Sequence, residues 1–99
     1  MLIFRIEQSI NNEYDTYDMA MVVACDEEHA RCIHPMGNNT VWDPDAEVWI
    51  DADGDRKTLT ASMSWVSDPH EHVTVERFGM VTGGSAKPGD VLVSSFNAG

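Results

Sequence analysis

Residues 19–25 have the sequence MAMVVAC, an apolar run that is too short to span a membrane and is typical of a strand buried on both faces of a sheet. Asp26 follows this run directly and is a favourable helix N-cap, and Glu27 lies in the first turn, where the helix dipole favours carboxylates. Pro35 disfavours helical backbone at His34. The sequence therefore predicts a buried strand followed by a helix of about two turns, which needs a sheet to pack against.

Alternating apolar residues predict further strands on both sides of this unit. One covers residues 2–6, another begins at Val73, and the last covers residues 91–96. The apolar positions change parity at residues 76–77, which predicts a β-bulge there. These elements predict a single α+β domain over residues 1–99, with an antiparallel or mixed sheet of about five to six strands and one short helix packed across it.

The middle of the chain predicts a β-hairpin whose turn is the Asp-Gly pair at residues 53–54. Its two strands cover residues 47–51 and 58–65. In the first strand the even-numbered apolar residues are expected to face the core. Trp49 is then expected to face the solvent together with the neighbouring acids.

Charge is distributed unevenly along the chain. All eleven units of net negative charge lie in residues 1–55, where thirteen Asp and Glu residues stand against Arg5 and Arg31, whereas the remaining residues hold four acids and four bases. Such a polarised field attracts basic surfaces and repels phosphates. The sequence therefore favours a basic protein as the partner, with no direct contact to nucleic acid and no contact to an anionic membrane.

The densest group of acids falls on odd-numbered positions of the predicted hairpin. In an extended chain, residues two apart point to the same side about 6.8 Å apart, so this row imitates the regular charge of a nucleic-acid backbone. Trp49 shares the parity and is expected to stack on an Arg or Lys of the partner. The alternative is a solvated outer face that protects a sheet edge. The predicted partner-binding residues are Asp43, Asp45, Glu47, Trp49, Asp51, Asp53 and Asp55.

A second candidate surface surrounds residues 14–18, where two tyrosines alternate with acids in a turn-prone segment. A structural role is equally consistent, with the rings covering the core and the acids closing Asx turns. For an anionic nucleotide ligand, local guanidinium groups and aromatic stacking would have to offset the repulsion by the net charge. The residues predicted for this alternative ligand site are Tyr14, Tyr17, Arg31, His34, Arg77 and Lys87.

Two sequence patterns resemble metal-binding motifs, and each lacks part of its set of ligands. Residues 51–55 (DADGD) look like the opening of a calcium loop, but its sixth and twelfth positions lack the required Gly and Glu. His70 and His72 share one side of an extended segment and would form a zinc site if His34 came close. The sequence therefore predicts no cofactor and no bound metal.

The two cysteines, Cys25 and Cys32, do not have the C-x-x-C spacing. We expect both to fill the core as reduced thiols, and a cysteine nucleophile with a histidine partner is the alternative. The sequence thus favours a protein that is not an enzyme, with a small metal-dependent enzyme using the histidines as an alternative.

Several short segments near both ends of the chain form a recognisable pattern. They are residues 14–18 (YDTYD), 22–24 (VVA), 27–31 (EEHAR), 33–35 (IHP), 65–66 (WV), Pro69, Val73 with Val75, and 95–99 (SFNAG). These segments resemble small uncharacterised proteins of tailed bacteriophages, and the likeness is weak over residues 36–62. The resemblance implies a phage origin, and with it the cytoplasm of a host bacterium, where small acidic phage proteins often bind host machinery.

These observations predict a non-enzymatic acidic phage protein of the nucleic-acid mimic type. It is expected to bind and inhibit a basic, nucleic-acid-binding host protein, such as a component of a defence system. The main alternative is an oligomeric sponge that sequesters a nucleotide signal of host immunity. An exposed edge strand at residues 91–96 would pair with a copy of itself, so a homodimer is also expected.

Overall fold

The computed structural model describes the whole chain except residues 12–14, 38, 52–62, 81–83, 85 and 98–99. Four of its strands form an antiparallel sheet in the order β5-β1-β2-β6, and two form a separate antiparallel hairpin, β3-β4. The predicted α+β class is therefore confirmed. The elements are β1 (Leu2–Glu7), β2 (Thr16–Ala24), α1 (Glu27–Arg31), β3 (Val41–Asp43), β4 (Val48–Ile50), α3 (Pro69–His72), β5 (Thr74–Met80) and β6 (Val91–Asn97).

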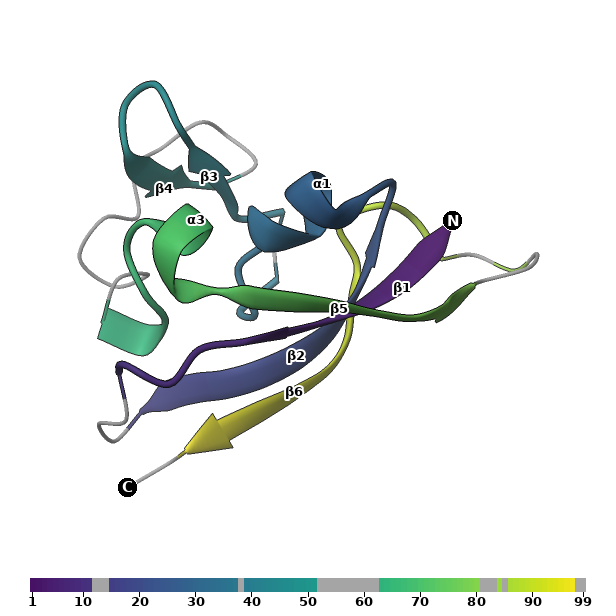
Figure 1. The fold of residues 1–99 in the computed structure, drawn as a ribbon, viewed down its shortest axis with the longest axis horizontal. Coiled ribbons are helices and arrows are strands. Elements are labelled where there is room, and N and C mark those ends of the chain that lie inside the picture. Colours follow the sequence, from purple (N-terminus) through teal and green to yellow (C-terminus); the bar gives the residue numbers. More distant parts are fainter. Residues whose placement is uncertain (12–14, 38, 52–62, 81–83, 85, 98–99) are drawn as a thin grey trace.

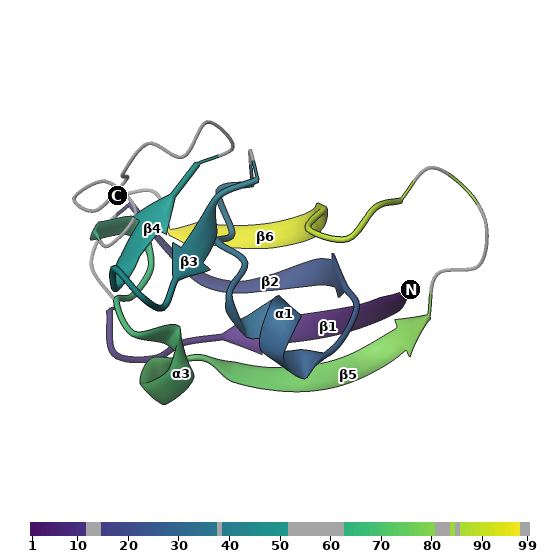
Figure 2. The ribbon, with the colours of Figure 1, turned by 90° about the horizontal axis from the view of Figure 1, so that it is seen from above.

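The helices α1 and α3 and the β3-β4 hairpin lie over one face of the four-stranded sheet (Figures 1 and 2). The core lies between these two layers. The sheet contributes alternate residues, so that Phe4 is paired with Val22 and Ile6 with Ala20, and all four are buried. Aromatic rings from the covering layer complete the core. Within the described ranges, no helix has the length and apolar character needed to cross a membrane.

The apolar run at residues 19–25 forms most of β2, a central strand, as predicted. The prediction that this strand is buried on both faces is confirmed only for its last three residues, 22–24. Before them the burial alternates, and Met19 and Met21 are half-buried on the face that the helices do not cover. The strand is therefore sheltered on two sides only at the end that leads into α1.

The predicted N-cap of α1 is confirmed, because the Asp26 carboxylate accepts a hydrogen bond from the His29 backbone N–H at 2.8 Å. The helix is shorter than predicted and ends at Arg31. Pro35 does not cause this ending. Ile33 already forms an isolated β-bridge with Val41, so the chain has left the helix before the proline is reached.

The hairpin differs from the predicted one. β4 lies within the predicted first strand, but it pairs with β3 upstream of it, so that Trp42 faces Trp49 across the ladder. The turn consists of residues 44–47, and the Glu47 N–H closes it by donating to the Asp43 carbonyl at 2.7 Å. Glu47 adopts a left-handed backbone with φ of 56°. The predicted turn at residues 53–54 and most of the predicted return strand lie outside the described residues.

β4 also faces in the opposite direction to the prediction, because Trp49 points inward and is 0 % exposed whereas Val48 and Ile50 are half-buried. The Trp49 indole N–H donates to the Val66 carbonyl at 2.9 Å. Burying one large aromatic ring removes more apolar surface from water than burying two smaller side chains halfway. The expected stacking of Trp49 on a partner's cation is therefore wrong.

The last third of the chain adds a helix and confirms the bulge. The sequence around Pro69 predicts only a break, but α3 begins there, with Pro69 in the first turn, where its missing N–H is tolerated. The pairing of β1 with β5 shifts register between Ile3 and Phe4. Phe78 is the extra residue, directly after the predicted residues 76–77, and it is 59 % exposed.

The two edge strands of the sheet differ in charge. β5 carries the exposed charges of Glu76 and Arg77. β6 has the sequence VLVSSFN without a charged residue, and its Val93 side chain is 58 % exposed. Because charges on an edge discourage pairing with another chain, β5 is protected against such pairing and β6 is not.

We expect Trp49→Ala to lower the free energy of unfolding by about 3–5 kcal/mol, because it leaves a cavity and an unpaired carbonyl at Val66. Val48→Ala, beside it on the half-buried side, should cost about 1 kcal/mol. Urea denaturation followed by circular dichroism measures both values. Equal losses, or a larger loss for Val48→Ala, would contradict the inward orientation of Trp49.

Candidate functional site

Three of the predicted partner-binding acids gather at the β3-β4 turn. Asp43 begins this turn, and its carboxylate oxygen accepts backbone N–H groups from Asp45 at 3.0 Å and from Ala46 at 3.3 Å. The side chains of Asp45 and Glu47 are exposed. Within the described part of the chain, none of these three acids is in an ion pair. The turn therefore exposes carboxylates on a backbone whose conformation is stabilised by the hydrogen bonds to the Asp43 side chain.

The extended row of carboxylates predicted from the sequence does not form here, because residues 44–47 are a turn. Pro44 and the hydrogen bonds to the Asp43 side chain favour the turn over extended backbone. Asp51 lies just after β4 and is half-buried, and Trp49 belongs to the core. Asp53 and Asp55 lie outside the described residues. The structure thus brings together Asp43, Asp45 and Glu47 of the seven predicted residues.

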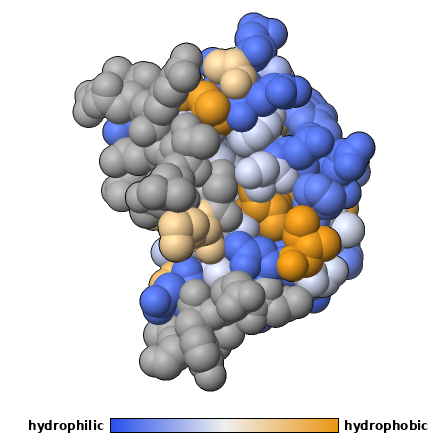
Figure 3. Space-filling model, turned by 90° about the vertical axis from the view of Figure 1, so that its left-hand side faces the viewer, coloured by the Kyte–Doolittle hydropathy of each residue, from blue (hydrophilic) through white to orange (hydrophobic). Residues whose placement is uncertain are grey.

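Further acids lie on the same layer as this turn. Asp26, Glu27 and Glu28 are exposed at the start of α1, which covers the sheet on the side where the hairpin lies (Figure 1). From the sequence, the first two appear only as helix-capping residues. Seen from one end, the described surface on the right of the view is mostly hydrophilic, and a hydrophobic patch interrupts it near the middle (Figure 3).

The residues of the alternative ligand site are scattered. His34 is 0 % exposed and packs edge-on against Trp49 at 4.9 Å between ring centroids. The Arg31 guanidinium donates to the Val73 carbonyl, and Arg77 is exposed on β5. Lys87 lies in the turn before β6, and Tyr14 is outside the described residues. The structure therefore assembles no single pocket from this set.

A cleft of about 480 Å³ opens between β6 and the loop that follows α1. Tyr17 is the one member of the predicted ligand set that lines it. Its ring is half-buried and contacts Phe96 at 4.7 Å between centroids. Among the described residues that line the cleft there is an acid, Asp90, and no basic side chain, which disfavours an anionic ligand at this position.

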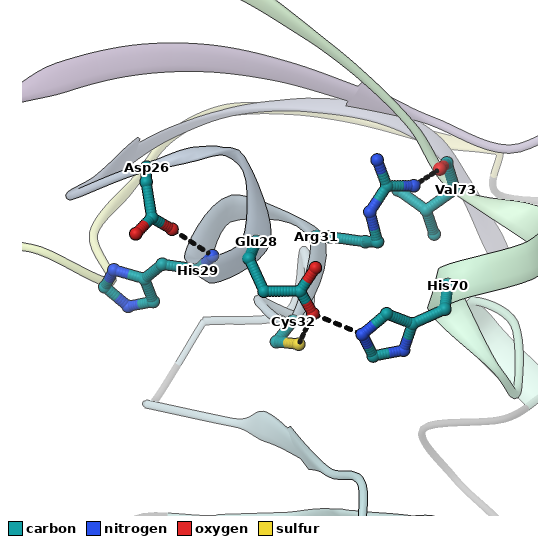
Figure 4. A network of polar contacts seen from close by, with 7 residues as sticks. All are labelled: Asp26, Glu28, His29, Arg31, Cys32, His70 and Val73. Atoms are coloured by element: carbon teal, nitrogen blue, oxygen red, sulfur yellow. Dashed lines mark hydrogen bonds and ion pairs between the residues drawn. The ribbon is translucent and has the colours of Figure 1, made fainter.

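The three-histidine zinc site, which the sequence suggests as an alternative, does not form. His34 is a core residue, and its Nδ1 accepts the Met36 backbone N–H at 3.0 Å. His70 and His72 lie in α3 instead of an extended segment, so residues two apart point in different directions. The described residues instead place His70 beside Glu28 and Cys32 of the α1 segment (Figure 4).

This Glu28–Cys32–His70 cluster converges on one oxygen atom. The Cys32 thiol donates to Glu28 Oε1 at 3.8 Å, and His70 Nε2 contacts the same oxygen. All three donor atoms lie within 4.8 Å of one another. The arrangement follows from α1, because residues four apart lie one above the other on a helix and Cys32 caps the last turn.

Arg31 holds the two halves of the cluster together. Its guanidinium donates to the carbonyl of Val73, the residue between α3 and β5 (Figure 4). This bond joins the end of α1 to the end of α3, and so it keeps His70 next to Glu28. Arg31, which the sequence favours as a ligand-binding cation, therefore has a positioning role in this structure.

The surroundings raise the pKa of the Cys32 thiol to about 11. Burial of the sulfur is the largest cause, followed by the negative charge of Glu28 and the hydrogen bond to it, while Arg31 acts in the opposite direction. Cys32 is therefore a protonated hydrogen-bond donor at neutral pH. The expectation that both cysteines fill the core is wrong for Cys25, which is exposed, whereas Cys32 is half-buried and packs against the core.

Only two of the three residues of this cluster could have been grouped from the sequence. Glu28 and Cys32 have a helical spacing of four residues, which a helix beginning at Asp26 would place on one face. His70 is 42 residues from Glu28, and only the tertiary fold brings them together.

No family model, no curated protein and no solved structure matches this chain. The functional argument therefore rests on the charge and geometry of the described residues, together with the sequence patterns above.

We expect Cys32 in the folded, metal-free protein to react with iodoacetamide about 10-fold more slowly at about pH 8 than in the urea-unfolded chain. The raised pKa lowers the thiolate fraction roughly 100-fold, and the higher nucleophilicity of the more basic thiolate recovers part of the rate. Peptide mass spectrometry of timed samples measures the rate.

Glu28→Gln should accelerate the reaction of Cys32 a few-fold, because it removes the carboxylate charge that opposes the thiolate. Glu27→Gln is the matched control and should leave the rate unchanged. Equal rates for Cys32 in the folded and unfolded chains would contradict the burial of the sulfur, and a rate that Glu28→Gln leaves unchanged would show that the contact with Glu28 is absent in solution.

Proposed function

We propose that this protein acts by binding, and that its acidic hairpin turn docks on a basic, nucleic-acid-binding surface of a host protein. The observation that carries the proposal is the group of Asp43, Asp45 and Glu47 on one ordered turn. Asp43 fixes the turn through its side-chain hydrogen bonds, and Asp45 and Glu47 expose their carboxylates. A partner's Arg or Lys can therefore pair with them without breaking an ion pair described within this chain.

The net charge of −11 supports the same proposal. A charge of this size speeds the encounter with a cationic surface, and the effect weakens as salt screens it. The exposed acids at the start of α1 lie on the same layer and extend the negative surface beyond the turn. Competition with nucleic acid for the basic surface is the proposed basis of inhibition.

The likeness of both chain ends to small tailed-phage proteins supports a bacterial host protein as the partner. In that setting, a component of a defence system is the target that we propose. Because the target's own substrate is a polyanion, displacement of nucleic acid from it provides the discriminating measurement.

We expect the triple variant Asp43→Asn, Asp45→Asn, Glu47→Gln to lose capture of its target from the heparin-retained protein fraction of a bacterial lysate. The amide side chains keep the size of the residues and, at position 43, an acceptor for the turn. Captured proteins are identified by mass spectrometry at low and high salt, with DNA added as a competitor.

A matched control removes the same amount of charge elsewhere, at the exposed residues Asp68, Glu71 and Glu76, as Asp68→Asn, Glu71→Gln, Glu76→Gln. This control should retain most of the capture. If both triple variants lose the target equally, the effect is one of total charge and the hairpin is not the docking surface. If the hairpin variant still captures the target, the proposal is also wrong.

We also propose that β6 pairs with β6 of a second copy to form a homodimer. β6 is an edge strand of the sheet and carries no charged residue along Val91–Asn97. Antiparallel pairing of the same strand about a two-fold axis satisfies the free backbone groups of both copies. The charge of each copy opposes this association at low salt, so screening should strengthen it.

Val93→Lys should shift the dimer towards monomer, because a lysine on an edge strand discourages pairing. Phe78→Lys on the opposite edge is a matched control, since the two side chains are 58 % and 59 % exposed. Sedimentation velocity at low and high salt measures the distribution. A protein that stays monomeric at all salt concentrations, or a dimer that Val93→Lys leaves intact, would rule out pairing through β6.

A further inference from the structure

The geometry points to a zinc site formed by Glu28 Oε1, Cys32 Sγ and His70 Nε2. This inference goes beyond the proposed binding function and does not depend on it. Carboxylate oxygen, thiolate sulfur and imidazole nitrogen are the three donor types that zinc accepts in proteins. They come from two separate segments of the chain, which α1 and α3 bring together (Figure 4).

The distances suit a tetrahedral ion. With Zn–S about 2.3 Å and Zn–O about 2.0 Å, a tetrahedral site separates sulfur and oxygen by about 3.5 Å. Cys32 Sγ and Glu28 Oε1 lie 3.8 Å apart, and no pair among the three donor atoms exceeds 4.8 Å. His70 Nε2 lies closer to Glu28 Oε1 than the roughly 3.3 Å that separates two such ligands of one tetrahedral ion, so the imidazole has to move away from the carboxylate. Rotation of the Glu28 and His70 side chains would then place all three donors around one ion.

The donor set selects the class of metal. Calcium and magnesium prefer sites made only of oxygen ligands, whereas a thiolate with an imidazole favours zinc and similar borderline ions. Three protein ligands leave the fourth tetrahedral position for water. The Glu28 and His70 side chains are 63 % and 40 % exposed, so an ion reaches the site from solvent without opening the fold.

The backbone around the site is held independently of any metal. Asp26 caps the start of α1, and Arg31 bonds to the Val73 carbonyl beyond α3. The ligands therefore do not have to be gathered from a flexible chain, which lowers the entropic cost of binding. The large negative charge of the protein adds a favourable field for a divalent cation.

Binding exchanges protons for the metal. The S–H bond of Cys32 breaks as the Zn–S bond forms, and its proton leaves to solvent. Without metal, His70 donates from Nε2 to the Glu28 carboxylate. Zinc takes the lone pair of Nε2, so the neutral ring then carries its proton on Nδ1. Glu28 gives up its two hydrogen bonds and binds the ion through the same oxygen.

Cobalt(II) is the direct probe, because a cobalt–thiolate bond gives a charge-transfer absorption that carboxylates and imidazoles alone do not. We expect the purified full-length protein to bind one Co²⁺ per chain with this absorption, and Zn²⁺ to displace it. Zinc should also raise the melting temperature, since it binds the folded state in preference to the unfolded one.

The chain offers a matched control for each ligand. Glu28→Gln, Cys32→Ser and His70→Gln should each weaken binding at least about 10-fold, and Cys32→Ser should abolish the thiolate absorption. Glu27→Gln, Cys25→Ser and His72→Gln change the same residue types nearby and should leave the affinity unchanged. Circular dichroism confirms that each variant is folded.

Several results would overturn the zinc site. One is the absence of a cobalt–thiolate absorption, and another is binding lost equally in ligand and control variants. A third is an absorption that follows Cys25 instead of Cys32. Because the experiment contains no partner protein, its failure leaves the docking proposal untouched, and loss of docking leaves the metal measurement intact.

Discussion

The core of this protein depends on a thin layer of short elements that covers one face of the sheet. The buried Trp49 indole holds this layer in place. The described helices have only five and four residues, and such helices are unstable alone. Trp49 connects the hairpin to the Val66 carbonyl and packs against Trp42 and His34. The hairpin, the loop after α1 and the segment before α3 therefore meet at this ring, and its burial fixes the orientation of the hairpin that carries the acidic turn.

The sequence correctly predicted those elements whose structure depends only on residues adjacent in the chain. The alternation of β1, the neutral strand β6 and the Asp26 cap required only neighbouring residues. The hairpin could not be predicted in the same way, because Val48, Trp49 and Ile50 are all apolar and the pattern does not say which side faces inward. That choice depends on the Val66 carbonyl and on the aromatic rings in the covering layer, which become neighbours only in the fold. His70 joins the cluster for the same reason.

The acidic turn and the Glu28–Cys32–His70 cluster lie on the same covering layer and have different chemistry. The turn presents hydrated carboxylates that suit a broad cationic surface. In the cluster, a carboxylate, a half-buried thiol and an imidazole face one another, which suits a single small ion. Metal binding with release of the thiol proton changes the charge beside α1 by one positive unit, so it would make this part of the layer less acidic while the hairpin keeps its charge.

The left-handed backbone of Glu47 has a consequence for why an acid occupies that position. Asp15, Asn39 and Asp68 share this conformation, and short Asp and Asn side chains tolerate it. The longer side chain of a glutamate does not stabilise this backbone conformation in the same way. Compared with a glycine, it destabilises the folded turn by about 1 kcal/mol. Glycine would therefore make a more stable hairpin, and Glu47 places an exposed carboxylate on the turn at the cost of this conformational strain.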